Sequence, residues 1–258
     1  MPTKAELRDD AMTALKRSVA FARAELAALA ALAVVALGLM AFVELADDMT
    51  EADGQAFDQT VLMAMRPFAD DPHRAWGPWW LEEAAADLTS LGGISVLTLF
   101  AVMVIGFLWF QRKWLSSVLL LAGLAGGVAL SEGTKALFER ERPPEIYQAV
   151  ETINASFPSG HALLSTVFYL SIGVMLTRAF PRRRFKTYVL GCAILIALLV
   201  GVTRVYLGAH WATDVLAGWS LGAAWAMALW LVAWAVQRLQ RRHATGLQDA
   251  PDPVEPSA

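Results

Sequence analysis

The sequence is short of the residues that cross-link small secreted proteins or bind structural metals. It has a single cysteine, Cys192, which excludes an internal disulfide, and no group of Cys and His residues has the spacing of a zinc site. Cys192 lies in an apolar run, which favours a packed thiol over a reactive one. The formal net charge is −3, so no basic excess indicates a nucleic-acid partner.

Charge of either sign is also scarce. Only 17% of the 258 residues are charged whereas 57% are hydrophobic, and the mean hydropathy is +0.46. A soluble domain of this size could not bury so much apolar surface. The composition also excludes a disordered chain, a coiled coil and a collagen-like repeat. It therefore indicates a membrane protein.

Six apolar stretches predict an all-α integral membrane protein, a bundle of six transmembrane helices. About 20 helical residues cross the hydrocarbon core, and the six stretches are Leu26–Val43, Leu91–Phe110, Trp114–Leu130, Ala162–Leu176, Tyr188–Val202 and Val215–Val236. We interpret the first as a retained span and not a cleaved signal peptide, because its charged leader is long and no A-x-A site follows the stretch before Asp47 and Asp48.

The basic residues predict the orientation of these spans. With both termini in the cytoplasm, fifteen of the 21 Lys and Arg residues fall on the cytoplasmic side, as the positive-inside rule requires. These are Lys4, Arg8, Lys16, Arg17, Arg23, Arg112, Lys113, Arg178, Arg182, Arg183, Arg184, Lys186, Arg238, Arg241 and Arg242. We therefore expect an integral inner or plasma membrane protein whose loops after spans one, three and five face the periplasm or exterior.

This topology divides the chain into three parts. Residues 1–25 form a cytoplasmic N-terminal segment, residues 26–236 the membrane domain, and residues 237–258 a polar cytoplasmic tail that we expect to be disordered. The outer loop 44–90 is acidic and rich in Trp and Pro, which predicts short interfacial helices or turns. It is a plain connector or a lid that guides substrate. Glycine pairs four residues apart in spans three and six favour close packing within one bundle over dimerisation, and the oligomeric state stays open.

Ionisable residues gather at the outer ends of spans three to six, in three segments. The first runs from Lys135 to Pro143 and carries Lys135 and Arg142, about two helical turns apart if the helix continues. Lys neutralises a phosphate as a point charge, whereas Arg binds two oxygens at once. Taken alone, both residues could simply anchor the end of a span.

The second segment, Phe157–His161, directly precedes span four. Ser159 is a suitable N-cap, and Gly160 allows an anion to approach the free N–H groups of the helix. His161 lies in the first turn, where it could donate a proton or simply face lipid headgroups.

The third segment, Thr203–Asp214, joins spans five and six by a turn that we expect at Gly208. His210 and Asp214 are four residues apart and can share one helix face. A carboxylate beside imidazole fixes its tautomer and leaves the other nitrogen free to attack, although a purely structural pair is the alternative. Together with Arg204, the three segments describe a phosphate-handling site with a nucleophile.

The ordered set K-x6-R-P, P-S-G-H and [S/T]-R-x5-H-x3-D, which spans Lys135 to Asp214, resembles the signature of the type 2 phosphatidic acid phosphatase superfamily. This family includes membrane lipid-phosphate and undecaprenyl-diphosphate phosphatases. In one departure, Thr203 stands where the family usually has serine. Because threonine keeps a hydroxyl, we expect its phosphate contact to survive.

The resemblance implies a role for each matching residue. His210 would be the nucleophile that forms a phosphohistidine, Asp214 would orient it, and His161 would be the general acid. The phosphate would be held by Lys135, Arg142, Ser159, Gly160 and Arg204. No metal or other cofactor is expected, because three fixed cations replace magnesium. Arg140 and Glu141 lie between motif positions and receive no catalytic role.

These expectations predict a metal-independent lipid phosphate or diphosphate phosphatase that acts at the outer leaflet. Undecaprenyl diphosphate is slightly favoured as substrate, while phosphatidylglycerophosphate and phosphatidate also fit. A phosphotransferase of the same family is the main alternative. A non-enzymatic transporter or anion-binding protein is a distant one, because the ionisable groups gather at one face and not at the midplane.

Overall fold

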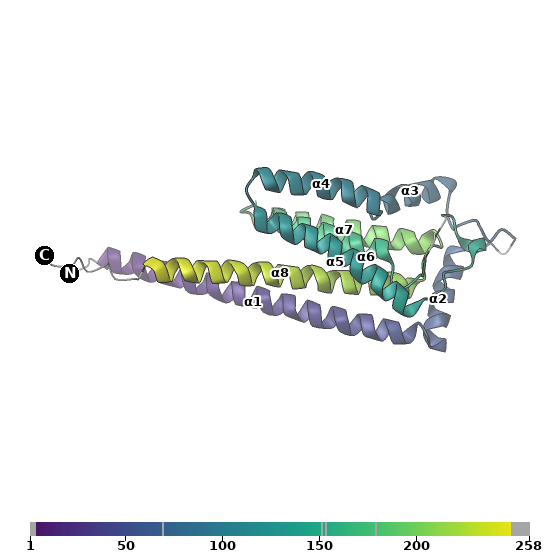
Figure 1. The fold of residues 1–258 in the computed structure, drawn as a ribbon, viewed down its shortest axis with the longest axis horizontal. Coiled ribbons are helices and arrows are strands. Elements are labelled where there is room, and N and C mark those ends of the chain that lie inside the picture. Colours follow the sequence, from purple (N-terminus) through teal and green to yellow (C-terminus); the bar gives the residue numbers. More distant parts are fainter. Residues whose placement is uncertain (1–3, 69, 151, 153, 179, 249–258) are drawn as a thin grey trace.

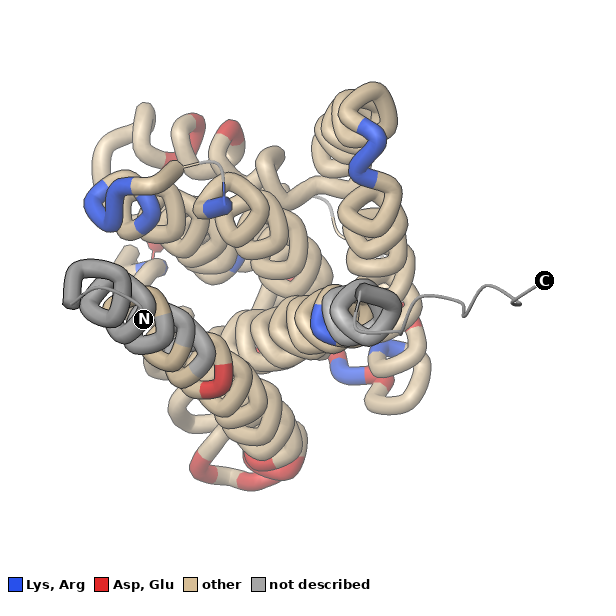
Figure 2. The backbone as a smooth tube through the Cα atoms, turned by 90° about the vertical axis from the view of Figure 1, so that its left-hand side faces the viewer, with Lys and Arg blue, Asp and Glu red and all other residues tan. Residues whose placement is uncertain are grey.

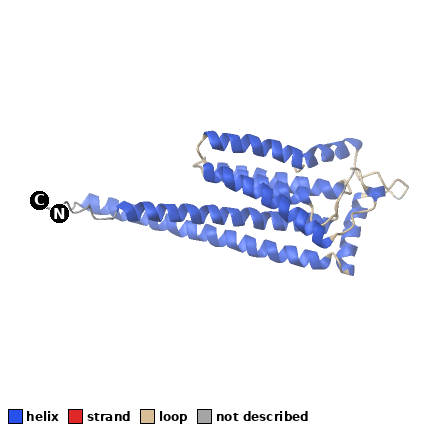
Figure 3. Ribbon diagram, viewed as in Figure 1, coloured by secondary structure: helices blue, strands red, loops and turns tan. Residues whose placement is uncertain are grey.

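The computed structural model describes residues 4–68, 70–150, 152, 154–178 and 180–248, and these residues form helices and loops without a strand (Figure 3). The helices are α1 (Lys4–Asp48), α2 (Ala52–Met65), α3 (Trp79–Ser90), α4 (Ile94–Phe110), α5 (Trp114–Phe138), the short 3-10 helix η1 (Glu145–Tyr147), α6 (Gly160–Thr177), α7 (Arg183–Tyr206) and α8 (Ala212–Gln248). The all-α class predicted from the sequence is therefore confirmed.

The long helices form one bundle in which successive helices run in opposite directions (Figure 1). The first and last helices, α1 and α8, lie side by side along their length, so both termini are at the same end. Helix α6 is central and packs against α5, α7 and α8. The connections α5–α6 and α7–α8 consequently meet at the end of the bundle that is distant from the termini.

Five helical segments of the described chain are long and apolar enough to cross a membrane: Ala24–Asp48, Trp114–Phe138, Gly160–Thr177, Arg183–Tyr206 and Ala212–Gln240. The remaining predicted span is a bent pair, α3 and α4, whose axes differ by 46°. Counted as one span, this pair completes the predicted six. The chain is a multi-pass membrane protein.

The bend between α3 and α4 lies at Gly92 and Gly93, where there is no room for a side chain on Gly92. A Cβ atom there would lie 2.4 Å from Val200 and 3.1 Å from the carbonyl oxygen of His161. Tyr169 donates a hydrogen bond of 3.0 Å to the Leu91 carbonyl, which satisfies a free acceptor at the end of α3. The glycine pair thus lets the broken span press against the start of α6.

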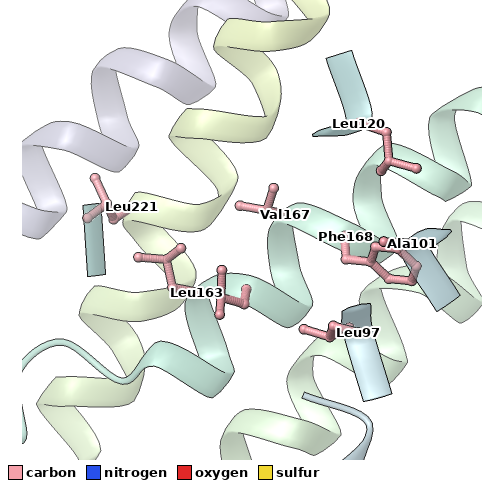
Figure 4. Close-up of a cluster of buried hydrophobic side chains, with 8 residues drawn as sticks. Leu97, Ala101, Leu120, Leu163, Val167, Phe168 and Leu221 are labelled. Atoms are coloured by element: carbon pink, nitrogen blue, oxygen red, sulfur yellow. The ribbon is translucent and has the colours of Figure 1, made fainter. Parts of the chain in front are cut away.

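The largest buried cluster joins α4, α5, α6 and α8 (Figure 4). Its members are Leu97, Ala101, Leu120, Leu163, Leu164, Val167, Phe168 and Leu221. The glycine pairs of the sequence lie within this bundle, as predicted: a Cβ on Gly127 would lie 3.0 Å from Leu164, and one on Gly222 would lie 2.8 Å from the Leu163 carbonyl. Close helix packing is therefore their role.

Helix α8 continues beyond residue 236, where the sequence predicts the end of the membrane domain. Residues 237–248, for which the sequence predicts a disordered tail, continue α8 without interruption. At the start of this extension Arg238 forms an ion pair with Glu25 of α1 and stacks on Trp234, which ties the two long helices together. Residues 249–258 lie outside the described part of the chain.

The outer loop 44–90 is largely helical, as the expectation of short helices required. It contains α2 and α3, and the intervening Trp76, like Trp79 and Trp80 at the start of α3, is exposed. Exposed indole rings are typical of the headgroup level of a bilayer. The loop also contributes one buried carboxylate, Asp58, to the interior.

The short connections at the end that holds the termini are basic. Arg112 and Lys113 lie between α4 and α5, and the α6–α7 connection is rich in arginine. Figure 2 views the molecule from this end, with Lys and Arg on the nearer connections and several Asp and Glu in the more distant part. The charge asymmetry of the sequence thus follows the long axis of the bundle.

Candidate active site

A cavity of about 270 Å³ lies at the end of the bundle opposite the termini. All three motif segments of the sequence contribute to its wall. Its lining includes six of the eight predicted site residues, namely Lys135, Arg142, Gly160, His161, Arg204 and His210. The structure therefore brings together residues that are up to 75 positions apart in the sequence.

The end of α5 places the first two cations. Lys135 lies in the last turn of the helix, which stops at Phe138 because Glu139 adopts a left-handed conformation (φ 45°). The helix does not continue to Arg142, and the chain instead turns back. Arg142 donates hydrogen bonds to the carbonyl oxygens of Asn154 (2.8 Å) and Ala209 (2.6 Å). These bonds fix its guanidinium in the cavity wall.

The start of α6 supplies backbone N–H groups and the positive end of a helix dipole. Ser159 occupies the N-cap position, although its side chain makes no capping hydrogen bond. A Cβ on Gly160 would lie 3.0 Å from Ser131 Oγ and 3.7 Å from Lys135 Nζ, so glycine keeps this backbone close to the cation. An anion in the cavity would meet both.

The turn between α7 and α8 is built around Gly208, as predicted. Its φ of +67° favours glycine, and a Cβ would lie 2.1 Å from the Tyr147 carbonyl oxygen. Just before this turn, Arg204 is buried, and its Nη1 donates to Thr89 Oγ1 at 3.3 Å. The turn directs His210 back toward the same cavity.

His210 is held from behind by Asp214. Its Nδ1 lies 3.4 Å from Asp214 Oδ2 and 3.4 Å from Ser156 Oγ, while its Nε2 lies 3.3 Å from Arg142 Nη1. Because a guanidinium can only donate, Nε2 must accept, and the proton is assigned to Nδ1 on the Asp214 side. The lone pair of Nε2 is therefore on the side of Arg142.

His161 lies next to the bend between α3 and α4. A Cβ built on Gly93 would lie 3.8 Å from His161 Nε2. The ring lines the cavity together with His210 and Arg204. Two imidazoles thus face one space, one from the first turn of α6 and the other from the connection between α7 and α8. In this geometry one can attack while the other transfers a proton.

Burial shifts the protonation of the His210 side chain. It lowers the pKa of His210 from 6.5 to about 4, and Asp214 opposes the shift in part. Burial also lowers the pKa of Arg142, although arginine stays charged at neutral pH. At neutral pH the site therefore combines a neutral imidazole with fixed cations.

Two buried side-chain atoms in the described part of the chain have no hydrogen-bond partner, and both belong to predicted site residues. They are Ser159 Oγ and Arg204 Nε. Buried polar groups are normally paired. Of the two residues, Arg204 lines the cavity and Ser159 directly precedes Gly160, which also lines it. The unused donor of Arg204 suits the oxygen atoms of a bound phosphate.

Thr203 lies apart from the cavity, and three residues near the site were missed by the sequence prediction. Thr203 does not line the cavity, because its hydroxyl donates to the Val200 carbonyl of its own helix (2.7 Å). The missed residues are Asp58, Arg140 and Ser156, which all surround Asp214 or its neighbour Thr213. None belongs to a motif, although the charge of Arg140 near the outer end of the third predicted span was a visible signal.

Comparison with known proteins agrees with this geometry. Residues 116–238 match the PAP2 superfamily, a range that includes every predicted site residue. Phosphatidylglycerophosphatase B of Bacillus subtilis (strain 168) is 37% identical over 144 residues, which cover 55% of this chain and 70% of that protein. An undecaprenyl-diphosphatase of Sulfolobus acidocaldarius is 34% identical over 119 residues, or 44% of this chain and 53% of the relative.

A solved structure supports the assignment at the level of the fold. The crystal structure of a transmembrane PAP2 type phosphatidylglycerolphosphate phosphatase from Bacillus subtilis superimposes with a TM-score of 0.69 at 30% identity, covering 76% of this chain and 93% of that one. Sequence, motif geometry and fold agree, and the chain belongs to the PAP2 superfamily of phosphatases.

Proposed function

We propose that this protein hydrolyses a membrane lipid phosphate or diphosphate through a phosphohistidine at His210. The observation that carries the proposal is the position of His210 Nε2. This nitrogen lies beside Arg142 in a cavity that Lys135 and Arg204 also line. Phosphoryl transfer is one of the few reactions that need a neutral imidazole among fixed cations.

The three cations supply the electrostatic part of the reaction. They bind the phosphate oxygens, and the Gly160 amide at the start of α6 adds a backbone donor. Because these groups are already in place before the reaction, they stabilise the charge of the transition state without reorganisation. The proposed chemistry therefore needs no metal ion.

In the first step, the lone pair of His210 Nε2 attacks phosphorus. The bond between phosphorus and the leaving oxygen breaks, and His161 donates a proton to that oxygen. The products are the lipid alcohol, or the lipid monophosphate when a diphosphate reacts, and a phosphohistidine. Asp214 stabilises the positive imidazole through Nδ1–H.

In the second step, water attacks the phosphohistidine and His161 accepts its proton. The N–P bond breaks, its electron pair returns to Nε2, and inorganic phosphate leaves. His161 is then protonated again for the next cycle. The balance of the two steps is hydrolysis of one phosphate ester or anhydride bond.

The cavity also has an apolar wall, which suits a lipid. Ile94, Val128 and Leu164 line it beside the polar residues, and Ile94 and Val128 are exposed on the surface of the bundle. An acyl or prenyl chain could lie along this wall while its headgroup reaches the cations. The names of the relatives favour phosphatidylglycerophosphate and prenyl diphosphates as substrates.

We propose that the cavity opens on the outer leaflet. The basic connections of α4–α5 and α6–α7 are at the opposite end of the bundle, and basic loops favour the cytoplasm. The measurement is labelling of single cysteines, introduced at Glu51 and at Arg182 into a Cys192→Ala background, by an impermeant reagent in intact cells. Labelling at residue 182 alone would show that the cavity opens on the cytoplasmic side.

The activity is tested by phosphate release from the purified protein in detergent micelles. The panel contains phosphatidylglycerophosphate, phosphatidate, undecaprenyl diphosphate and a soluble sugar phosphate. We expect release from at least one lipid, persistence in EDTA and inhibition by vanadate, which mimics pentacoordinate phosphorus. Adding a lipid alcohol or sugar acceptor separates hydrolysis from phosphoryl transfer.

The matched variants are His210→Ala and His73→Ala, the second an exposed histidine outside the cavity. His210→Ala should release no phosphate and should not form the acid-labile phosphohistidine that labelled substrate leaves on the protein. His73→Ala should keep both properties. Normal turnover by His210→Ala would disprove the nucleophile, and loss of activity on chelation would disprove the metal-free reaction.

A further inference from the structure

A second group of charges lies behind His210, outside the substrate cavity. Arg140 bridges two carboxylates: its Nη1 donates to Asp214 Oδ1 at 2.6 Å and its Nη2 donates to Asp58 Oδ2 at 2.7 Å. Asp214 is fully buried, Asp58 almost so, and the Arg140 side chain is 11% exposed. We call these three residues the support cluster.

Asp58 brings the outer helix α2 into this cluster. Its Oδ1 accepts the backbone N–H of Thr213 at 2.9 Å, and its Oδ2 accepts the Thr213 hydroxyl at 2.6 Å. Thr213 lies in the first turn of α8, so Asp58 caps that helix from another element. The carboxylate also complements the positive end of the α8 dipole.

Asp214 uses both of its oxygens. Oδ1 is held by Arg140, while Oδ2 accepts the Ser156 hydroxyl and the backbone N–H of Trp211 (2.9 Å). This leaves Oδ2 facing Nδ1 of His210 at 3.4 Å. Rotation of the carboxylate would break the bond to Arg140 as well as those to Ser156 and Trp211, so Arg140 is one of three groups that fix the direction of Oδ2.

We propose that Asp58 and Arg140 are positioning residues of the phosphatase reaction. They fix the Asp214 carboxylate, and through it the Nδ1–H tautomer of His210 that leaves Nε2 free to attack. The inference rests on the proposed function of the cavity. It also gives part of the outer loop 44–90 a role in the reaction, because α2 carries Asp58.

Arg66 provides a comparison within the same end of the molecule. It is also a buried arginine, but it donates to the carbonyl oxygens of Tyr147 and Tyr206, both at 2.8 Å. These bonds tie loops together and do not reach Asp214. Arg66 therefore serves as a control for a buried arginine whose role is structural.

The first experiment compares Asp58→Asn, Arg140→Lys and Arg66→Lys. Lysine cannot bridge two carboxylates as a guanidinium does, and misplacement of a reacting group by about 1 Å costs about 100-fold in rate. We expect Asp58→Asn and Arg140→Lys to lose about 10- to 100-fold in kcat with KM and the inhibition constant of inorganic phosphate unchanged. Arg66→Lys should lower thermal stability while the folded protein keeps its kcat.

A second cavity makes the position of Arg140 chemically accessible. It measures about 240 Å³ and is lined by Asp58, Arg140 and Trp211 together with residues of α2. Guanidinium added at millimolar concentration should therefore enter an Arg140→Ala variant and restore kcat with saturation. Sodium chloride at equal concentration should not restore it, and guanidinium should leave the kcat of the folded control variant Arg66→Ala unchanged.

A third measurement reads the tautomer without any substrate. The imidazole nitrogen chemical shifts of His210 should report Nδ1–H in the unmodified protein and a mixture with Nε2–H in Arg140→Lys. Absence of phosphate release from every lipid would disprove the proposed function and leave this result intact. An unchanged tautomer, or unchanged kcat in both Asp58→Asn and Arg140→Lys, would overturn the positioning role.

Discussion

Two groups of charged side chains meet at the start of α8, and they use their hydrogen-bonding capacity in opposite ways. In the support cluster, one guanidinium and two carboxylates are joined at 2.6 and 2.7 Å. The cavity cations Lys135, Arg142 and Arg204 instead line an open volume, and Arg204 Nε is without a hydrogen-bond partner in the described part of the chain. Arg142 is bound by backbone carbonyl oxygens and Lys135 pairs with Glu132 at 3.4 Å, so the unused donor is that of Arg204. Paired charges hold a site in place, whereas an unused donor is available to a ligand.

The contrast is sharpest between Arg140 and Arg142, which are only two positions apart. Arg140 bridges Asp58 and Asp214, while Arg142 is fixed by backbone carbonyl oxygens and lies 3.3 Å from His210 Nε2. The left-handed residue Glu139 ends α5 and starts the loop that carries both arginines. The loop after α5 therefore supplies both Arg140, which holds the carboxylate of Asp214 that orients His210, and Arg142, a cation for the phosphate.

The largest expected effect comes from removing a cavity cation. Arg204→Ala should lower kcat/KM by about 100- to 1,000-fold, the typical cost of losing one preorganised donor to a developing negative charge. It should also raise the inhibition constant of inorganic phosphate, which the support-cluster variants leave unchanged. Steady-state kinetics with phosphate as product inhibitor measure both quantities.

Arg74→Ala is the matched control for this experiment, because Arg74 is an exposed arginine that stacks on Phe68. It should keep both kcat/KM and phosphate inhibition. If Arg204→Ala bound inorganic phosphate as tightly as the parent protein, Arg204 would belong with the structural arginines and the distinction between the two groups would fail.

A smaller loss is expected at Gly160. A methyl group there would come 3.0 Å from Ser131 Oγ and 3.7 Å from Lys135 Nζ. Gly160→Ala should therefore displace Lys135 or the helix start and lower kcat/KM by about 10- to 100-fold. Gly133→Ala on α5 is the control, because a Cβ there meets nothing within 4 Å. Equal activity of the two variants would show that the α6 start does not need a bare backbone.

The pH dependence tests whether His210 reacts as a neutral base. Burial lowers its pKa from 6.5 to about 4, so its neutral form persists down to that pH. After correction for ionisation of the substrate phosphate, the acid limb of kcat/KM should lie near pH 4, falling about tenfold per pH unit below it. An acid limb of kcat/KM near pH 6.5 would show that the His210 side chain is solvated.

The same shift has a consequence for stability. The pKa of His210 is lower in the folded protein than in the unfolded chain, so the unfolded chain binds the proton more readily between these values. The free energy of unfolding should therefore decrease as the pH falls from about 6.5 to about 4. Thermal unfolding of the parent protein and of His210→Gln over this range measures the difference.

Much of the fold follows from short-range properties of the sequence. The six apolar stretches, the turn at Gly208 and the acidic, Trp-rich outer loop all correspond to features of the structure. Hydropathy predicts spans because a bilayer requires continuous apolar helices. It does not predict their ends: α8 continues to Gln248 because α1 packs along it, a contact between the two ends of the chain.

The site divides in the same way. Residues in ordered motifs could be assigned to the cavity, because their spacing places them at adjoining helix ends. Asp58 could not be assigned, since it is 82 positions from Arg140 and belongs to no motif. Thr203 shows the converse, because a hydroxyl at a motif position was satisfied by its own helix. Partners across elements depend on packing, which no spacing rule specifies.

The smallest expected effect concerns the other end of the bundle and closes the comparison of charge pairs. Arg238 and Glu25 form an ion pair between α8 and α1 with side chains 31% and 35% exposed. Partly exposed pairs contribute about 0–1 kcal/mol, whereas removing one partner of a buried pair costs about 3–5 kcal/mol. Arg238→Ala should therefore lower the unfolding temperature only slightly and leave kcat unchanged.

Arg140→Ala should lower both the unfolding temperature and kcat, because Asp58 and Asp214 would face each other without a cation. Similar losses of stability in the two variants would mean that burial does not distinguish these pairs, and that the support cluster acts on stability no differently from a peripheral ion pair.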